Sequence, residues 1–155
     1  MPELRSPSCT SIASRQGPCT LRGAACRLRH NAAYDILEGV AWEVEYSDEF
    51  GEWWDSLTAA EQKSVDFSVS LLQQVGPTLR MPHSSGVEMS RHAHMRELRI
   101  QHEGRPYRVL YAFDPRRTAL LLIGGDKTGN DRWYDEYVPL ADDIYDRHLR
   151  ELQED

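Results

Sequence analysis

The stretch that decides the fold is MRELRIQHEGRPYRVLYAFD, residues 95–114. Apolar and polar residues alternate along both of its halves, which is the pattern of half-buried β-strands. Between the halves lies Glu103-Gly104, a pair that fits the two-residue turn of a β-hairpin. If this turn joins two strands, residue 102 pairs with residue 105 and Arg99 lies opposite Arg108. The stretch therefore predicts an antiparallel hairpin.

The two faces of this hairpin differ in polarity. One face collects Leu98, Ile100, Tyr107, Val109 and Tyr111, and the other collects Glu97, Arg99, Gln101 and Arg108. The apolar set agrees across both strands, which supports the register. Arg105 belongs to the turn, and Arg96 shares the face of Leu98 near the end of its strand. We therefore expect Arg99 and Arg108 to stand together on the face away from the apolar set.

Two arginines opposed on a sheet need an explanation, because opposed like charges cost up to about 1 kcal/mol. In one explanation, Glu97 or acids from the flanking segments neutralise the pair. In the other, the pair is an anion site, because two guanidiniums side by side present forked donors that suit phosphate oxygens. The residues alone leave both explanations open.

The surrounding sequence is acidic, with a net charge of −7 over 155 residues. Residues 39–86 carry eight acids and two bases, and residues 118–155 carry ten acids and four bases. Between them, residues 87–117 carry seven bases and four acids. Binding of nucleic acid through the whole surface is disfavoured, since the electrostatic part of the affinity increases with the number of phosphates that basic residues neutralise. Any contact with RNA or DNA is expected to be local to the basic segment.

The length favours one folded domain, which we place at residues 39–155. Residues 1–38 are rich in Ser, Arg, Gly, Ala and Cys without sustained periodicity, which predicts a flexible extension or a translation start placed too early. Three cysteines at positions 9, 19 and 26 match no zinc spacing, so we expect reduced thiols in a cytoplasmic protein. Neither a membrane-spanning run nor a signal peptide is recognisable, so no membrane association is expected.

Ahead of the hairpin, the sequence predicts one strand and two helices. Residues 42–46 alternate between large apolar residues and glutamates, which is typical of a strand. Ser47 is expected to cap the first helix. Thr58-Ala-Ala-Glu61 is a capping-box pattern for the second helix, which Gly76-Pro77 ends.

After a loop over residues 78–86, we expect strands at 87–91 bent into 95–101, at 106–113 and at 119–123. The last contains the continuous run LLLI, which suits a central strand buried on both faces. A short helix over 131–137, a break at Pro139 and a final helix over 140–152 complete the chain. The order β-α-α-β-β-β-α predicts an α+β domain with helices on one side of a small, mostly antiparallel sheet.

Three segments carry a resemblance to a known family: ELR followed by YRVLYAFD, then LLLIGGDKTGN, then a terminal helix with a tyrosine. Over about residues 40–152 the chain resembles the RelE/HigB-like toxins of bacterial toxin–antitoxin pairs, in particular the phage Gp49-like branch. The resemblance implies the RelE-like fold, with two N-terminal helices packed on a small sheet and a C-terminal helix. It also implies a ribosome-dependent endoribonuclease that cuts mRNA and is silenced by a tightly bound antitoxin, often one with a helix-turn-helix domain as in HigA.

The resemblance assigns four catalytic candidates by position. Arg99 matches the arginine that ends the family's basic strand, and Arg108 matches the arginine of its YR motif. Lys127 stands where the family has a basic residue after the last strand, and Tyr134 matches the tyrosine of the terminal segment. We expect the arginines to stabilise charge on the phosphate, because arginine stays protonated, and Lys127 to position the phosphate.

RNA cleavage by attack of the 2′-hydroxyl also needs groups that transfer protons. Tyr134 or one of His92 and His94 is the candidate acid or base, with histidine favoured by its ordinary pKa and tyrosine by family position. Trp133 or Tyr134 could stack on a nucleobase. The residues expected to touch the substrate are Arg96, His92, His94 and Trp133. Histidines here have no diagnostic metal spacing, so no metal or cofactor is expected.

Two functional classes remain open for this sequence. The first is a ribosome-dependent endoribonuclease with an antitoxin, the ribosome and mRNA as partners. The second is a non-catalytic protein, either a ParE-like inhibitor of DNA gyrase or an inactive toxin homologue. The arginine pair favours the first class. The net charge of −7, with Met95 and Glu97 where the family often has lysine, favours the second.

Overall fold

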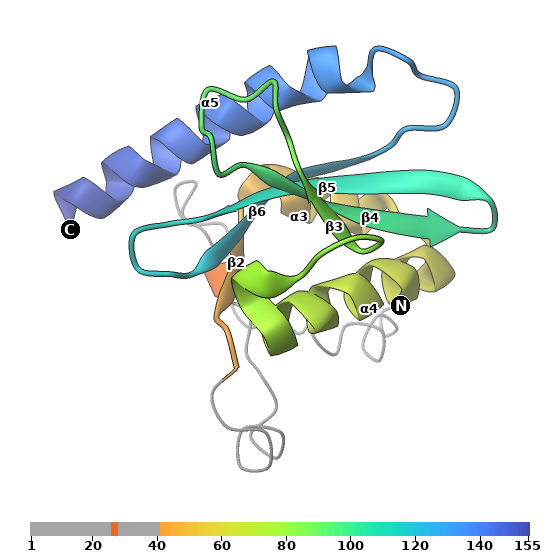
Figure 1. The fold of residues 1–155 in the computed structure, drawn as a ribbon, viewed down its shortest axis with the longest axis horizontal. Helices are drawn as coiled ribbons and strands as arrows, with labels where there is room; N and C mark the ends of the chain where they lie inside the picture. Colours follow the sequence, from red (N-terminus) through yellow and green to blue (C-terminus); the bar gives the residue numbers. More distant parts are fainter. Residues whose placement is uncertain (1–25, 28–40) are drawn as a thin grey trace.

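The structure, a computed structural model, describes residues 26–27 and 41–155 (Figure 1). The expected extension over residues 1–38 therefore lies outside the described residues, apart from β1 (Cys26–Arg27). This two-residue strand pairs antiparallel with β2 (Val44–Tyr46).

The described elements after β2 are α3 (Asp48–Ser56), α4 (Ala59–Val75), the 3₁₀ turn η2 (Gly76–Thr78), β3 (Ser84–Gly86), β4 (Arg96–His102), β5 (Arg105–Phe113), β6 (Ala119–Asp126) and α5 (Trp133–Glu154). They form one sheet in the order β1-β2-β6-β5-β4-β3. The β2–β6 pair is parallel and the other pairs are antiparallel. The predicted α+β class with a mostly antiparallel sheet is confirmed.

The predicted hairpin register is also confirmed. In the β4–β5 ladder, Arg99 lies opposite Arg108 and His102 opposite Arg105. The two turn residues have positive φ angles, 51° at Glu103 and 81° at Gly104. Positive φ at both central positions is the property of a type I′ turn, whose twist matches that of the flanking strands.

Both predicted helix starts are confirmed by their caps. The Ser47 hydroxyl accepts a hydrogen bond from the backbone N–H of Phe50 at the start of α3. Thr58 and Glu61 exchange side-chain to backbone hydrogen bonds at the start of α4, which completes a capping box. These contacts satisfy backbone donors that the first helical turn leaves unpaired.

The sheet lies between two layers of helix (Figure 1). On one face, α3 and α4 pack on a core that includes Leu98, Val109 and Leu121. On the other face, α5 packs on a core that includes Leu110 and Leu122. The expectation that all helices lie on one side was wrong, because β5 and β6 are apolar on both faces and each face needs cover. The expected burial of the LLLI strand on both faces is confirmed.

Two boundaries differ from the sequence predictions. The strand expected at 87–91 lies instead at Ser84–Gly86, inside the segment expected to be a loop. Ser and Gly have low strand propensity, so pairing with β4 decides this element, and residues after Val87 form turns.

The expected break at Pro139 is absent, since α5 runs continuously from Trp133 to Glu154. Proline removes one intrahelical hydrogen bond, which would have gone to the carbonyl of Asp135. Both residues are exposed, so water can satisfy that carbonyl without ending the helix. Across the described residues, no helix combines the length and apolar character needed to cross a bilayer.

Candidate anion-binding site on the hairpin

The predicted catalytic residues meet where the hairpin, the end of β6 and the start of α5 converge. Arg99 and Arg108 project from β4 and β5 on the face covered by α5. Lys127 follows the last residue of β6, and Tyr134 is in the first turn of α5. The Nζ atom of Lys127 lies 5.4 Å from the ring centroid of Tyr134, within reach of a cation–π contact.

The centre of this cluster is the carboxylate of Glu97, whose side chain is only 4% exposed. Its Oε1 lies 3.0 Å from Nη1 of Arg99, and its Oε2 lies 3.8 Å from Nε of Arg108. The Tyr134 hydroxyl donates to Oε2 at 2.8 Å, and the Ser85 hydroxyl donates to Oε1 at 2.9 Å. Of the two explanations for the arginine pair, neutralisation by Glu97 is therefore observed.

The two arginines differ in access to solvent. The Arg99 side chain is 33% exposed, whereas that of Arg108 is only 8% exposed. Arg108 donates through Nη1 to the carbonyl of Tyr107, but its buried Nε has no hydrogen-bond partner. The distance from this Nε to Glu97 is that of an ion pair and too long for a hydrogen bond. The Nε–H donor of Arg108 is thus buried beside the Glu97 carboxylate without a hydrogen bond.

Tyr134 is set up to keep its proton. Burial raises the pKa of its hydroxyl, and the hydrogen bond to Glu97 raises it further. A phenol with a raised pKa stays protonated near neutral pH, so it can donate a proton but is a poor base. Among the two proton-transfer roles left open by the sequence, this environment favours the acid.

Two adjacent glycines allow α5 to approach the sheet at this point. A Cβ at Gly125 would lie 2.8 Å from Nε1 of Trp133 and 3.1 Å from the ring of Tyr137. On the opposite face, a Cβ at Gly124 would lie 2.4 Å from the ring of Trp53. The pair is therefore required for close approach of aromatic rings on both faces of β6.

Trp133, expected to touch the substrate, is enclosed by this packing. Its side chain is 0% exposed and stacks on Tyr137 at a centroid distance of 4.4 Å and an interplanar angle of 8°. Its buried Nε1 has no hydrogen-bond partner. A nucleobase does not reach the indole in this conformation, so Trp133 shapes the start of α5.

Three other residues expected to touch the substrate, Arg96, His92 and His94, do not lie beside the arginine pair. Arg96 points to the opposite face of the sheet, where it donates to the Ser84 hydroxyl and the Leu79 carbonyl. His92 and His94 lie in the loop before β4 and contact Asp146 and Tyr145 of α5. Tyr145 follows Tyr134 by eleven residues, or about 16 Å along a helix. The structure therefore separates these histidines from the site.

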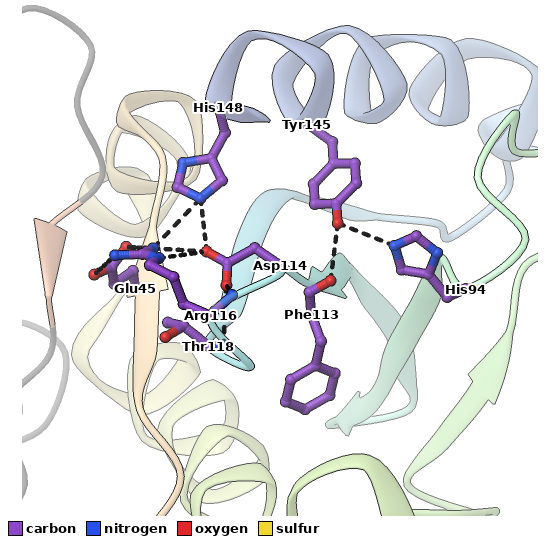
Figure 2. Close-up of polar contacts among 8 residues, drawn as sticks. All are labelled: Glu45, His94, Phe113, Asp114, Arg116, Thr118, Tyr145 and His148. Atoms are coloured by element: carbon purple, nitrogen blue, oxygen red, sulfur yellow. Dashed lines mark hydrogen bonds and ion pairs between the residues drawn. The ribbon is translucent and has the colours of Figure 1, made fainter. Parts of the chain in front are cut away.

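A second polar cluster ties the other half of α5 to the sheet (Figure 2). Asp114, with a side chain 0% exposed, accepts hydrogen bonds from His148 and from the backbone N–H and guanidinium of Arg116. It also accepts from the backbone N–H of Thr118. The hydroxyl of Tyr145 donates to the carbonyl of Phe113 beside it. These bonds join the β5–β6 turn to the C-terminal half of α5.

This cluster contains the one group of potential metal ligands found within the described residues, Glu45, Asp114 and His148. Their ligand atoms lie within 4.8 Å of one another. The Nη2 atom of Arg116 donates to Glu45 at 2.8 Å and also to Asp114. The guanidinium supplies positive charge to these carboxylates, which supports a structural role for the cluster.

Two important residues carry little local signal in the sequence. Glu97 is one of several acids that could neutralise the arginines, and its position on the same face as Arg99 and Arg108 is the signal that distinguishes it. Asp114 stands in the turn sequence Asp114-Pro115, which by itself indicates no buried contact. Its partner His148 is 34 residues away, and no local pattern connects them.

The fold fits the RelE/HigB-like class of proteins, and comparisons with known proteins agree. The family model described as "Phage derived protein Gp49-like (DUF891)" matches residues 52–146, more than half of the chain. The chain therefore belongs to the Gp49-like family.

Two relatives come from Mycobacterium tuberculosis (strain ATCC 25618 / H37Rv). The protein named "Putative toxin HigB2" is 33% identical over 121 residues, which cover 77% of this chain and 60% of that protein. The protein named "Putative toxin HigB3" is 45% identical over 91 residues, which cover 58% of this chain and 78% of that protein. The chain thus spans less than two thirds of the first relative and more than two thirds of the second. No solved structure matches the chain.

Proposed function

We propose that this protein is the toxin of a toxin–antitoxin pair and acts as a ribosome-dependent endoribonuclease on mRNA. The observation that carries the proposal is the convergence of Arg99, Arg108, Lys127 and Tyr134 at one end of α5. Its relatives named as HigB toxins support the toxin role.

The proposed reaction is attack of a ribose 2′-hydroxyl on the adjacent phosphorus. The bond from O2′ to phosphorus forms and the bond from phosphorus to O5′ breaks. The 2′-hydroxyl proton passes to solvent water, and the leaving 5′-oxygen takes a proton from the general acid. The guanidinium of Arg99, being partly exposed, meets the phosphate first, and Arg108 stabilises the added negative charge from below. Lys127 positions the phosphate from the loop after β6. Cationic side chains supply the charge stabilisation, so the proposed reaction is metal-independent.

Tyr134 is the proposed general acid. Its raised pKa keeps the hydroxyl protonated at neutral pH, and its position beside Glu97 and Arg108 brings that proton to the proposed phosphate site. Protonation of the 5′-oxygen by a positioned acid contributes a factor of about 10²–10⁴ in such reactions. His92 and His94 lie in the loop before β4 and contact the C-terminal half of α5, away from the arginines, which leaves Tyr134 as the better candidate.

A groove beside Arg99 offers RNA an additional contact surface next to β4. It has a volume of about 490 Å³ and lies between α4 and β4, with Lys63, His83 and Arg99 among its lining residues. Its lining also includes Phe67, whose side chain is exposed, and no acidic residue. In a chain of net charge −7, this lining is locally suited to an anion.

The proposed partners are a cognate antitoxin with a helix-turn-helix domain, the ribosome and mRNA, which place the action in the cytoplasm. Exposed apolar side chains offer contact area to a partner, among them Phe67 and Met81, both 61% exposed. Capture of the product of the neighbouring open reading frame, by purification of the tagged full chain, tests the antitoxin.

The decisive experiment is expression of the full chain followed by mapping of mRNA 5′ ends. Cuts at codon boundaries in translated frames are expected for the wild type and for Arg105→Ala, whose arginine is half-exposed at the turn. Arg108→Ala should abolish the cuts and the growth arrest while antitoxin binding persists. Retained cutting by Arg108→Ala would count against the assigned role.

The alternative is a ParE-like gyrase inhibitor or an inactive homologue. The observation that favours it is that Glu97 pairs with both arginines. At position 97 the resembled family often has a lysine, which would leave the arginines without this carboxylate. DNA damage without codon-aligned RNA cuts would establish the gyrase inhibitor. Neither DNA damage nor RNA cuts would establish an inactive homologue.

A further inference from the structure

The carboxylate of Glu97 has the partners that the proposed site would offer to a phosphate. It accepts hydrogen bonds from Arg99, Tyr134 and Ser85, and it forms an ion pair with Arg108. Two guanidiniums and two hydroxyls around one pair of oxygens form an oxyanion site with charge-assisted bonds. In the free protein this site is filled from within.

The occupation is imperfect in one respect. The Nε of Arg108 is buried without a hydrogen-bond partner and lies 3.8 Å from Oε2 of Glu97. The Arg108 side chain is more than nine-tenths buried, so water access to this donor is limited. A carboxylate has two oxygens, whereas a phosphate has more acceptors and can meet more donors at once.

We propose that Glu97 is the internal ligand of an anion site, which it holds in shape and which a phosphate of the substrate takes over. This inference rests on the proposed function for the identity of the substrate, but the anion site itself is independent of catalysis. Glu97 is then a positioning residue: it keeps Arg108 neutralised, Arg99 oriented and Tyr134 docked until the phosphate arrives.

The arrangement gives a regulatory consequence. Phosphate entry must displace the Glu97 carboxylate, and the Tyr134 hydroxyl bonded to it must change partner. Because Tyr134 belongs to the first turn of α5, movement of that turn is coupled to occupation of the site. The free protein is therefore held in a closed state that binds anions weakly.

Anion rescue tests the proposal in the full chain without any measurement of cleavage. Glu97→Ala vacates the site and leaves Arg108 buried without its counterion, so the melting temperature should fall by at least about 10 °C. Inorganic phosphate at constant ionic strength should refill the site. It should recover at least about 5 °C once its concentration is roughly tenfold above its Kd.

Glu61→Ala is the matched control, because Glu61 also accepts from a tyrosine and an arginine, Tyr107 and Arg105, but on the other face of the sheet. Its single, partly exposed arginine should give no recovery beyond that caused by chloride. Equal recovery of both variants, or none for Glu97→Ala, would overturn the proposal.

Glu97→Gln covers the case in which the alanine variant does not fold. The amide keeps the shape and removes the negative charge about 4 Å from the arginines, so phosphate should bind at least about fivefold more tightly than to wild type. Glu97→Asp restores the charge and should bind as weakly as wild type. If Glu97 were purely structural, the Gln variant would bind phosphate no more tightly than the Asp variant, and that result would overturn the proposal.

These outcomes are separable from failure of the proposed function. Anion rescue with no codon-aligned RNA cuts would retain the internal ligand and reject the endoribonuclease. RNA cuts without anion rescue would retain the endoribonuclease and reject the internal ligand.

Discussion

Asp114→Asn should strongly destabilise the fold, because it removes a fully buried charge that ties α5 to the sheet. The Asp114 side chain is fully buried and takes hydrogen bonds on Oδ1 from the backbone N–H groups of Arg116 and Thr118. Its Oδ2 takes bonds from the Arg116 guanidinium and from His148 at 2.9 Å. Asparagine keeps an acceptor at the first position and places an NH₂ donor at the second.

The expected cost follows from the contacts at Oδ2. A donor facing two donors loses those bonds, and each hydrogen bond to a charged group contributes about 1.5–3 kcal/mol. The Arg116 side chain is 36% exposed, so water compensates part of its loss. We therefore expect a loss of about 3 kcal/mol in the free energy of unfolding. For a folded part of this size, that corresponds to a fall of about 12 °C in melting temperature.

Thermal unfolding followed by circular dichroism at pH 7 measures this fall. Asp143→Asn is the matched control, because Asp143 is 73% exposed on the same helix and pairs with Arg91. Its removal should cost less than about 0.5 kcal/mol. Hydrogen exchange should also rise in the C-terminal half of α5 for Asp114→Asn. A melting temperature within about 3 °C of wild type would refute the role assigned to this cluster.

The same variant should change the response to acid. Burial alone would raise the pKa of Asp114, but hydrogen bonds from His148 and Arg116 outweigh it, and the pKa lies below its usual value of 3.8. A carboxyl with a lowered folded pKa stabilises above its unfolded pKa, and this stabilisation is lost as pH falls through the folded pKa. Below pH 4, Asp114→Asn should therefore lose less stability than wild type.

Three further results are expected. Gly125→Ala should lower the free energy of unfolding by about 1–3 kcal/mol, because the added Cβ meets Trp133 and Tyr137. In the control Gly86→Ala, the added Cβ has no atom within 4 Å, so urea unfolding should show a change of at most about 0.5 kcal/mol. Tyr134→Phe should lower RNA cleavage by about 10²-fold or more, and full activity would exclude Tyr134 as the acid. Its melting temperature should fall by about 6 °C, because the variant loses a hydrogen bond to the buried carboxylate of Glu97. The hydrogen bond from Tyr107 lowers the pKa of Glu61 to about 2. The stabilisation of the fold by the Glu61 carboxylate is therefore complete above about pH 4.5 and is lost as pH falls through 2. Glu61→Gln should flatten the dependence of stability on pH in this range, and an unchanged dependence would contradict the role of Glu61.

The parts of the fold that the sequence predicted correctly are those with local signals. The side-chain period of a strand permits only one register that buries the apolar set, so the opposition of Arg99 and Arg108 followed from the turn. The caps at Ser47 and Thr58 depend on residues three positions apart. Both features depend on residues close together in the chain, so the sequence alone is enough to predict them.

The parts that failed depend on tertiary packing. After Arg108, β5 carries Leu110 and Ala112 on the same face as the arginines, which was a readable sign that this face is covered. The position of α5 over it, and the burial of Arg108, came from contacts between distant segments. Pro139 does not break α5, because the effect of a proline inside a helix depends on whether the carbonyl that it leaves unpaired is exposed to water.

The cover provided by α5 changes the meaning of the arginine pair. A pair open to solvent would be neutralised by salt and would repel weakly, whereas burial of Arg108 makes a counterion obligatory. Glu97 supplies that counterion, and Tyr134 fixes its position. Neutralisation and anion binding are therefore compatible explanations of one site. The buried carboxylate stabilises the arginine pair in the folded protein, and a phosphate that replaces the carboxylate accepts hydrogen bonds from the same donors. An acidic surface around such a site restricts anion binding to ligands that can make this exchange.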